Sequence, residues 1–355
     1  MKLLTKRKNR IILILDVILL LAMCACFLGI SRLSSLLLSQ QEAQRWQGDN
    51  ELAFSQVSCF LPVDSKLVQN EVYSFRSSMM DAFHAASLES DNLLFTDCWC
   101  AFGKAAVSGV HGSGTASVTA VGGKYFDFHP LELLSGTYFS EDNFSPDLVI
   151  LDEELAWLLF GSSDVAGMSI NVEGREFTVS GVIAREDDFA SKLAYTSGMG
   201  LFMSYEAYSA LFEEGISTYE VVMPQPVKGF AMSTVEEKFP LNGGLAVENT
   251  GRFGYERLFR MLTGFGKRSM QTEGVLLPYW ENAARCIEDW CALLLFAEIL
   301  FSLLPLATLI VAVARSIRYA RNELEDDWWP AFKEKAAETI RKRQRRGWEK
   351  RHKKV

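Results

Sequence analysis

Residues 148–183, with the sequence LVILDEELAWLLFGSSDVAGMSINVEGREFTVSGVI, contain the pattern that decides the fold. The apolar run Leu148–Leu151 predicts a short buried strand. Asp152–Phe160 predicts a helix, because acids in its first turn complement the helix dipole and a glycine follows its last residue. Ser169–Val172 and Phe177–Ile183 predict two strands, and the glycine-containing turn between them indicates a hairpin.

The same rhythm continues on both sides of this stretch. Short strands and helices alternate with brief connections, which points to an α+β or α/β-sandwich domain. The glycine-rich residues 103–123 include an alternating run at Ala116–Val121 and read as strand and turn rather than as a nucleotide-binding loop. The remaining predicted elements are a helix at Ser77–Leu88, a strand at Gly200–Ser204, a helix at Tyr205–Phe212 and a strand at Thr218–Met223.

Two long apolar segments flank this domain. Ile11–Ile30 has twenty residues with Asp16 as its only charge, and Cys291–Ala314 has twenty-four with Glu298 as its only charge. A helix of about 20 apolar residues crosses a hydrocarbon core of about 30 Å. We therefore expect two transmembrane helices, residues 11–30 and 291–314, with an extracytoplasmic α+β domain inserted between them.

Charge is distributed unevenly along the chain and sets the expected orientation. Residues 1–10 carry five basic side chains and no acid, and residues 315–355 carry a net charge of +7. The whole chain carries −8, so residues 11–314 carry −20. Because basic residues favour the cytoplasmic side of membrane helices, both termini are expected in the cytoplasm of a bacterial cell and the central domain outside it. A cleaved or lipid-modified signal peptide is the alternative for the first segment, although its apolar run is long for one.

The segments next to the two membrane helices have amphipathic patterns. Residues 31–46 carry apolar side chains at helical spacing and predict a stalk helix that leads into the core domain, residues 47–288. Residues 315–355 predict a basic amphipathic tail in the cytoplasm, as do the basic residues 1–10 at the other end. The tail is expected to bind anionic lipid of the inner leaflet. A solvated tail that only secures the topology is the alternative.

Four of the seven cysteines are expected outside the cytoplasm, where disulfides persist. These four, Cys59, Cys98, Cys100 and Cys286, allow three pairings, and the sequence does not choose among them. The motif Cys98-Trp99-Cys100 lacks the second cysteine pair or nearby histidines of a zinc site. We therefore expect neither a metal site nor another cofactor.

The order of motifs from Val118 to Ile183 resembles a known family. The segments VTAVGGKYF (118–126) and LELLSGTYF (131–139) precede the stretch quoted above. This order is similar to the extracytoplasmic core domain of MacB/FtsX-like ABC transporter permeases. The shared positions are structural, with glycines at turns and a helix that packs on the sheet: Gly136, Ala156, Phe160, Gly161, Gly167 and Gly181.

The resemblance implies a permease-like role but differs from the family in the membrane part. Such permeases usually have four membrane helices and a cytoplasmic segment that contacts the ATPase. This chain has two predicted membrane helices and a basic tail in that place, so it resembles a shortened relative. The resemblance implies other permease subunits and a separate ABC ATPase as partners, and no nucleic acid.

The sequence lacks the motifs of common enzymes. Gly264-Phe265-Gly266-Lys267-Arg268-Ser269 departs from a P-loop in glycine spacing and in the residue after lysine, and no metalloprotease or serine-hydrolase motif occurs. We therefore expect a protein that is not an enzyme. Asp16 and Glu298 are the candidate residues for helix association, because intramembrane carboxylates are costly unless they meet a partner. Snorkelling to the nearer interface is the alternative, and Pro305 is expected to kink the second helix.

Two functions fit these observations. The first is a non-enzymatic, permease-like membrane subunit of an ABC-type export or mechanotransmission system, whose ectodomain binds or moves an envelope substrate or partner. The second is a self-sufficient, membrane-anchored extracellular module for binding or sensing. The lack of a family-like coupling segment after the second helix favours the second function, and the family-like ectodomain favours the first.

Overall fold

A computed structural model describes residues 2–49, 52–88, 94–139, 147–195, 199–264, 277–323 and 329–352. The chain divides into two compact units. One unit is Leu28–Leu295, and the other combines Met1–Phe27 with Phe296–Val355. The long helices α1 (Lys2–Ser35) and α10 (Tyr279–Glu323) each contribute to both units.

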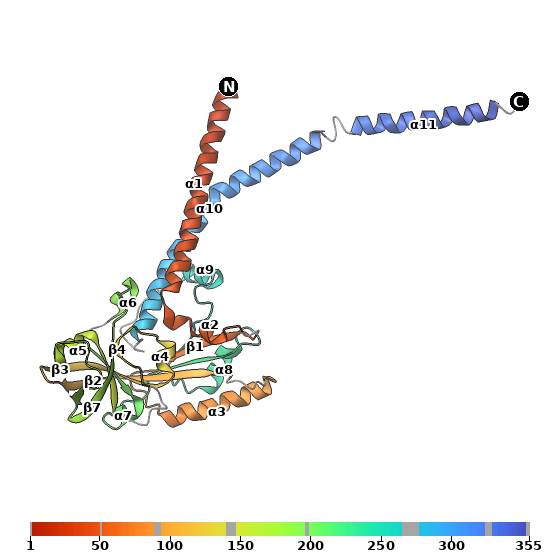
Figure 1. Ribbon diagram of the computed structural model, residues 1–355. Coiled ribbons are helices and arrows are strands. Elements are labelled where there is room, and N and C mark those ends of the chain that lie inside the picture. Colours follow the sequence, from red (N-terminus) through yellow and green to blue (C-terminus); the bar gives the residue numbers. More distant parts are fainter. Residues whose placement is uncertain are drawn as a thin grey trace. The chain divides into compact units, whose positions relative to one another are not determined.

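The unit Leu28–Leu295 contains a mixed ten-stranded sheet (Figure 1). The strand order is β10-β1-β9-β2-β3-β8-β5-β7-β4, and β6 pairs with β2 and β7. The pairs β3/β8 and β5/β7 are parallel, and the other pairs are antiparallel. The strands are β1 (Phe54–Phe60), β2 (Thr96–Ser108), β3 (Ser113–Gly123), β4 (Leu133–Gly136), β5 (Leu148–Asp152), β6 (Ser169–Val172), β7 (Arg175–Ile183), β8 (Gly200–Ser204), β9 (Thr218–Pro224) and β10 (Leu245–Glu248).

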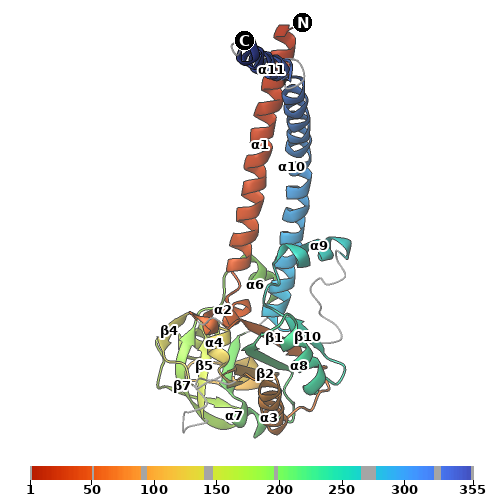
Figure 2. The ribbon, with the colours of Figure 1, turned by 90° about the vertical axis from the view of Figure 1, so that its right-hand side faces the viewer.

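Helices cover both faces of this sheet. On one face α3 and α8 pack against each other, and on the other α2 and α4 contact strands β1, β9 and β2 (Figure 2). The helices of this unit, besides its parts of α1 and α10, are η1 (Leu38–Gln40), α2 (Glu42–Gln47), α3 (Gln69–Ala85), α4 (Tyr125–Phe128), α5 (Glu153–Phe160), α6 (Phe189–Ala194), α7 (Tyr205–Ser209), α8 (Phe230–Lys238) and α9 (Tyr255–Thr263).

Alternation along the central strands sends side chains into two separate cores. Because successive residues of a strand point to opposite faces, Trp99 and Tyr219 enter the core beneath α3 and α8, together with Phe75 of α3. Cys98 and Cys100 enter the second core, with the aromatic residues of α4 and the start of α10. The sheet is therefore buried on both sides, as expected for a mixed α/β domain.

The local predictions for residues 148–223 are confirmed, except that the helix expected at Tyr205–Phe212 ends at Ser209. The Asp152 side chain accepts a hydrogen bond from the Leu155 backbone N–H and so caps α5, and Gly161 ends that helix with φ +73°. The strands and turns expected on both sides occur at β2–β3 and at β6 to β9. The helix expected at 77–88 begins earlier, at Gln69.

The single stalk helix expected over residues 31–46 is replaced by shorter elements. Helix α1 ends at Ser35, and η1 and α2 follow as separate turns. Tertiary contacts explain the break, since the Gln56 side chain on β1 donates to the Ser39 carbonyl and accepts from the Glu42 backbone N–H. Through these bonds, backbone groups of residues 39 and 42 pair with a side chain of the core domain.

The other unit contains the apolar parts of α1 and α10, and α11 (Trp329–His352). Two helical spans are long and apolar enough to cross a membrane, Arg7–Ser35 and Tyr279–Asn322. Pro305 lies inside α10, which continues to Glu323. The kink expected there stays a prediction, as do the limits of the membrane spans and the binding of the tail to lipid.

Candidate functional site

A buried group of charged side chains holds the first turns of α10 to the core domain. Arg252, which follows β10, donates to both carboxylate oxygens of Glu281 at 2.6 and 2.9 Å and to both of Glu288 at 2.7 and 3.0 Å. Arg285 donates to Glu281 at 3.0 Å. Gln40, next to the end of α1, accepts a fifth hydrogen bond from Arg252 at 3.0 Å. We call these five residues the Arg252 cluster.

The Arg252 cluster is closed to solvent and electrically balanced. The Arg252, Glu281 and Glu288 side chains are 1%, 0% and 2% exposed. All five N–H donors of the guanidinium are used, which is the geometry that arginine offers to paired carboxylates. Burial alone would raise the pKa of Glu281, but the charges and hydrogen bonds of Arg252 and then Arg285 outweigh burial and hold that pKa below its usual value.

Breaking such a cluster is costly, so α10 is firmly attached at this point. Removing one partner of a buried ion pair costs about 3–5 kcal/mol, because it leaves an uncompensated charge in a medium that solvates it poorly. Helix α10 thus carries two anchoring carboxylates, seven positions apart, on its domain-bound end. Displacement of that end would strain the loop after β10 and the segment after α1 together.

A partly open pocket of about 470 Å³ lies beside the first turn of α10. This ectodomain pocket falls within the range of small-ligand sites, about 300–1,000 Å³. Its walls come from β2, β3, β8, α6 and the start of α10, and they are largely apolar and aromatic. The lining includes Lys104, Arg185, Tyr195, Tyr279 and Asn282.

Two stacked tyrosines form one wall of the ectodomain pocket. The rings of Tyr195 and Tyr279 lie 4.4 Å apart and nearly parallel. The Tyr195 hydroxyl donates to Glu186, and the Arg185 guanidinium lies over the Tyr195 ring while it pairs with Asp152. Burial first and then Glu186 raise the pKa of both tyrosines, so both are neutral hydrogen-bond donors. The wall therefore combines apolar surface with fixed polar edges.

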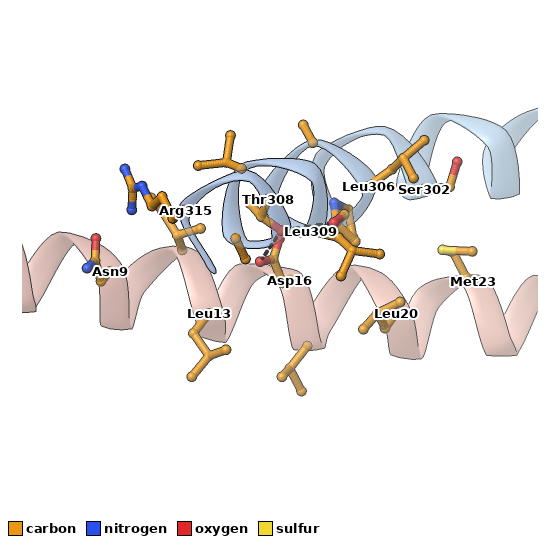
Figure 3. A pocket seen from close by; sticks show the side chains of 16 residues that line it. Asn9, Leu13, Asp16, Leu20, Met23, Ser302, Leu306, Thr308, Leu309 and Arg315 are labelled. Carbon is orange, nitrogen blue, oxygen red and sulfur yellow. Dashed lines mark hydrogen bonds between the residues drawn. The ribbon is translucent and has the colours of Figure 1, made fainter. Parts of the chain in front are cut away.

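The unit with the apolar helix parts holds one of the predicted intramembrane carboxylates. Thr308 of α10 donates to the Asp16 carboxylate at 2.8 Å (Figure 3). The second carboxylate oxygen, Oδ1, is buried and has no hydrogen-bond partner among the described residues. Both residues line a groove that also contains Met23, Ser302 and Pro305. Glu298 lies on α10 in the same unit and has interactions of its own.

The family-like positions lie where turns and packing need them. Gly136 has φ +75°, and a side-chain carbon there would lie 2.1 Å from the Ser180 carbonyl oxygen. Gly181 is its partner in the β4/β7 pair. Gly167 has φ +85° and open space around it. Ala156 and Phe160 of α5 are buried in the core on the same sheet face as α3 and α8, and α5 packs there against β3, β5, β7 and β8.

All seven cysteines are free thiols, although four of them were expected where disulfides persist. The P-loop-like string near Gly264 lies outside the described residues from 265 onward. The Arg252 cluster was missed from the sequence, although a signal for it exists. Glu281, Arg285 and Glu288 recur at spacings of four and three on one helix face, just before an apolar span.

Comparison with known proteins identifies the central domain. A sequence model of the MacB-like periplasmic core domain matches residues 99–238. The macrolide export ATP-binding/permease proteins MacB of Neisseria gonorrhoeae and of Neisseria meningitidis serogroup A are each 36% identical over 76 residues, 21% of this chain. The chain spans only 12% of the length of these relatives.

Two solved structures resemble part of this chain at low sequence identity. The periplasmic region of MacB from Actinobacillus actinomycetemcomitans is 18% identical with a TM-score of 0.38, and the match covers 55% of this chain and 89% of that structure. The extracellular domain of the ABC-type transporter YknZ from Gram-positive bacteria is 11% identical with a TM-score of 0.38, over 55% of this chain and 98% of that structure. Together with the two apolar helices, the matched domain indicates a membrane protein with an extracytoplasmic core. The family model confirms the core-domain fold expected from the motif order, and residues 99–238 of this chain form a MacB-like periplasmic core domain.

Proposed function

We propose that this chain is a non-enzymatic, permease-like membrane subunit in which the first turns of α10 move together with the ectodomain. The observation that carries this proposal is the Arg252 cluster, which ties α10 to the core domain through two buried carboxylates. A helix held in this way transmits displacement instead of pivoting freely. Both termini then lie in the cytoplasm, and movement imposed there by a partner reaches the ectodomain.

The ectodomain pocket is the proposed contact point for an envelope substrate. Tyr279 and Asn282 in its wall belong to the same helical turns as Glu281 and Arg285 of the Arg252 cluster. A bound molecule would therefore touch the segment that the cluster anchors. The apolar and aromatic lining, with Lys104 at its edge, suits an amphipathic molecule.

Partner chains are required because two helices do not enclose a pathway. Asp16, whose Oδ1 has no hydrogen-bond partner within the described part of the chain, is the candidate residue for association with a further membrane helix. We propose other permease subunits and a separate ABC ATPase as the neighbours. The basic tail after α10 is the proposed contact with anionic lipid.

The test is crosslinking in native membranes followed by mass spectrometry of what co-purifies with the full chain. Recovery of an ABC-type ATPase or a second permease is the expected result. A chain recovered alone, or only with copies of itself, would refute the subunit proposal and favour the anchored sensing module. Removal of residues 316–355 separates the two functions further, since a subunit assembled through its helices still co-purifies with partners and a sensor falls silent.

A photo-crosslinking amino acid placed at Tyr195 tests the pocket itself. Tyr195 lines the pocket, whereas Tyr73 on α3 is 44% exposed, does not line it, and serves as the matched control. Small amphipathic molecules crosslinked at Tyr195 and not at Tyr73 are expected. Equal labelling at both positions would contradict a substrate site in this pocket.

A further inference from the structure

The second core contains buried polar side chains that neither the Arg252 cluster nor the ectodomain pocket uses. Cys98 on β2 and Glu220 on β9 are register partners, and Ser58 on β1 is the partner of Glu220 on its other side. His129, directly after α4, places its Nε2 atom 2.5 Å from a Glu220 carboxylate oxygen. The Ser58 hydroxyl donates to the other carboxylate oxygen at 2.5 Å.

Three different kinds of donor atom meet at this point. The Cys98 sulfur, a His129 ring nitrogen and a Glu220 carboxylate oxygen all lie within 4.8 Å of one another. The three residues are 1%, 3% and 1% exposed. We call them the Cys98 cluster. Charged and polar groups are costly inside a core unless something satisfies them, so this arrangement calls for a specific reason.

A tyrosine beside His129 carries an unsatisfied hydroxyl group. Tyr125 of α4 is 2% exposed, and its ring centre lies 4.6 Å from that of His129. Its hydroxyl has no hydrogen-bond partner among the described residues. Tyr125 therefore brings an unsatisfied polar group into the same core as the Cys98 cluster.

We propose that Cys98, His129 and Glu220 bind a divalent transition-metal ion, with Zn²⁺ as the best match. Zinc accepts sulfur, nitrogen and oxygen ligands together, at about 2.3, 2.0–2.1 and 2.0–2.2 Å, in a tetrahedron. Those bond lengths separate the ligand atoms by about 3.3–3.6 Å. The His129 and Glu220 atoms reach this spacing when they part by about 1 Å, and the Cys98 sulfur lies within 4.8 Å of both.

The exchange of protons for metal keeps the core neutral. The Cys98 S–H bond breaks as the metal–sulfur bond forms, and that proton leaves to solvent. The proton shared by His129 Nε2 and Glu220 leaves as well, and the ion takes its place between the two atoms. Two protons are released for one divalent cation, so the net charge of the buried site is unchanged. Because the site is closed, the ion would enter as the chain folds.

The competing explanation is a structural His129–Glu220 ion pair that binds no metal. Metal analysis of the full chain, purified in detergent from cells grown with Zn²⁺ or with Co²⁺, distinguishes the two. About one metal ion per chain is expected in the wild-type protein. Tetrahedral Co²⁺ with a thiolate ligand also gives a thiolate-to-cobalt charge-transfer band, which a His–Glu pair alone does not.

The variants assign the ligands. Cys98→Ala is expected to lose the metal and the charge-transfer band, and Glu220→Gln to hold less metal while keeping the hydrogen bond from Ser58. Cys59→Ala is the matched control, since Cys59 is a fully buried thiol in the other core and should leave the metal content unchanged.

The metal content of the wild-type chain tests the proposal even if a variant fails to fold. Less than about a tenth of an ion per wild-type chain after growth with Zn²⁺, or a cobalt-loaded chain without the thiolate band, overturns the proposal. Equal metal content in Cys98→Ala and Cys59→Ala overturns it too.

Discussion

Replacing Arg252 by methionine removes the cation on which the attachment of α10 depends. Methionine fills much of the same volume, so the loss is mainly electrostatic. Glu281 keeps its hydrogen bond from Arg285, whereas the hydrogen bonds that Glu288 accepts from described residues all come from Arg252. Glu288 is then a buried carboxylate without compensation, and the expected loss of stability is about 3–5 kcal/mol. For a domain of this size that is a fall in Tm of roughly 6–20 °C.

The assay is thermal unfolding of the full chain in detergent, followed by tryptophan fluorescence. Lys228→Met serves as the control, because it removes an exposed ion pair. The side chains of Lys228 and its partner Glu256 are 84% and 70% exposed. No measurable change in Tm is expected for this control, since water already solvates both charges. If Arg252→Met unfolds at the same Tm as Lys228→Met, the argument is refuted.

A second substitution tests whether uncompensated charge is the cause. Glu288→Gln in the Arg252→Met background removes the unpaired charge and should recover at least half of the lost stability. If the double variant were no more stable than Arg252→Met, packing rather than charge would explain the loss.

The pH dependence follows from the lowered pKa of Glu281. A carboxyl whose folded pKa lies below its unfolded value, about 4.3, stabilises the fold above that value. This stability is lost as the pH falls through the folded pKa. The difference in Tm between wild type and Arg252→Met should therefore shrink below about pH 4.

The remaining predictions concern Glu42, Asp16 and two glycines. Burial raises the pKa of Glu42 to about 7, although the positive charge of Arg45 opposes this shift. The contribution of Glu42 to the stability of the fold therefore falls as the pH rises through that value. Glu42→Gln should raise the Tm more at pH 8 than at pH 5, and an equal rise at both would contradict this. Thr308→Val removes the only hydrogen bond that Asp16 accepts from described residues, and it should destabilise the pairing of α1 and α10 by about 1 kcal/mol in detergent unfolding. Asp16→Asn should destabilise the pairing less, because asparagine keeps an oxygen that accepts from Thr308. Gly167→Ala should cost about 1 kcal/mol because it strains only the backbone. Gly136→Ala should cost clearly more in chemical denaturation, because its side-chain carbon also meets a backbone oxygen; equal losses would show that the crowding is relieved.

Much of the domain follows from local signals. The Asp152 cap, the glycine that ends α5 and the alternation of β7 each act through residues within a few positions, so they form the same elements in any compact setting. The two apolar spans follow from composition alone, since length and lack of charge decide whether a helix suits a hydrocarbon core. The motif order was then sufficient to identify the domain.

The functional sites required the tertiary structure. The helix-face spacing of Glu281, Arg285 and Glu288 is readable, but their cation, Arg252, comes from a loop that no local pattern connects to them. Likewise, Cys98-Trp99-Cys100 lacks a histidine nearby in the sequence, and folding of α4 onto the sheet brings His129 to it. The predicted stalk fails for the same reason, because Gln56 of β1 competes for its polar groups. Periodicity and caps depend on sequence neighbours, whereas a buried polar group takes whichever partner the packed chain brings within hydrogen-bonding distance.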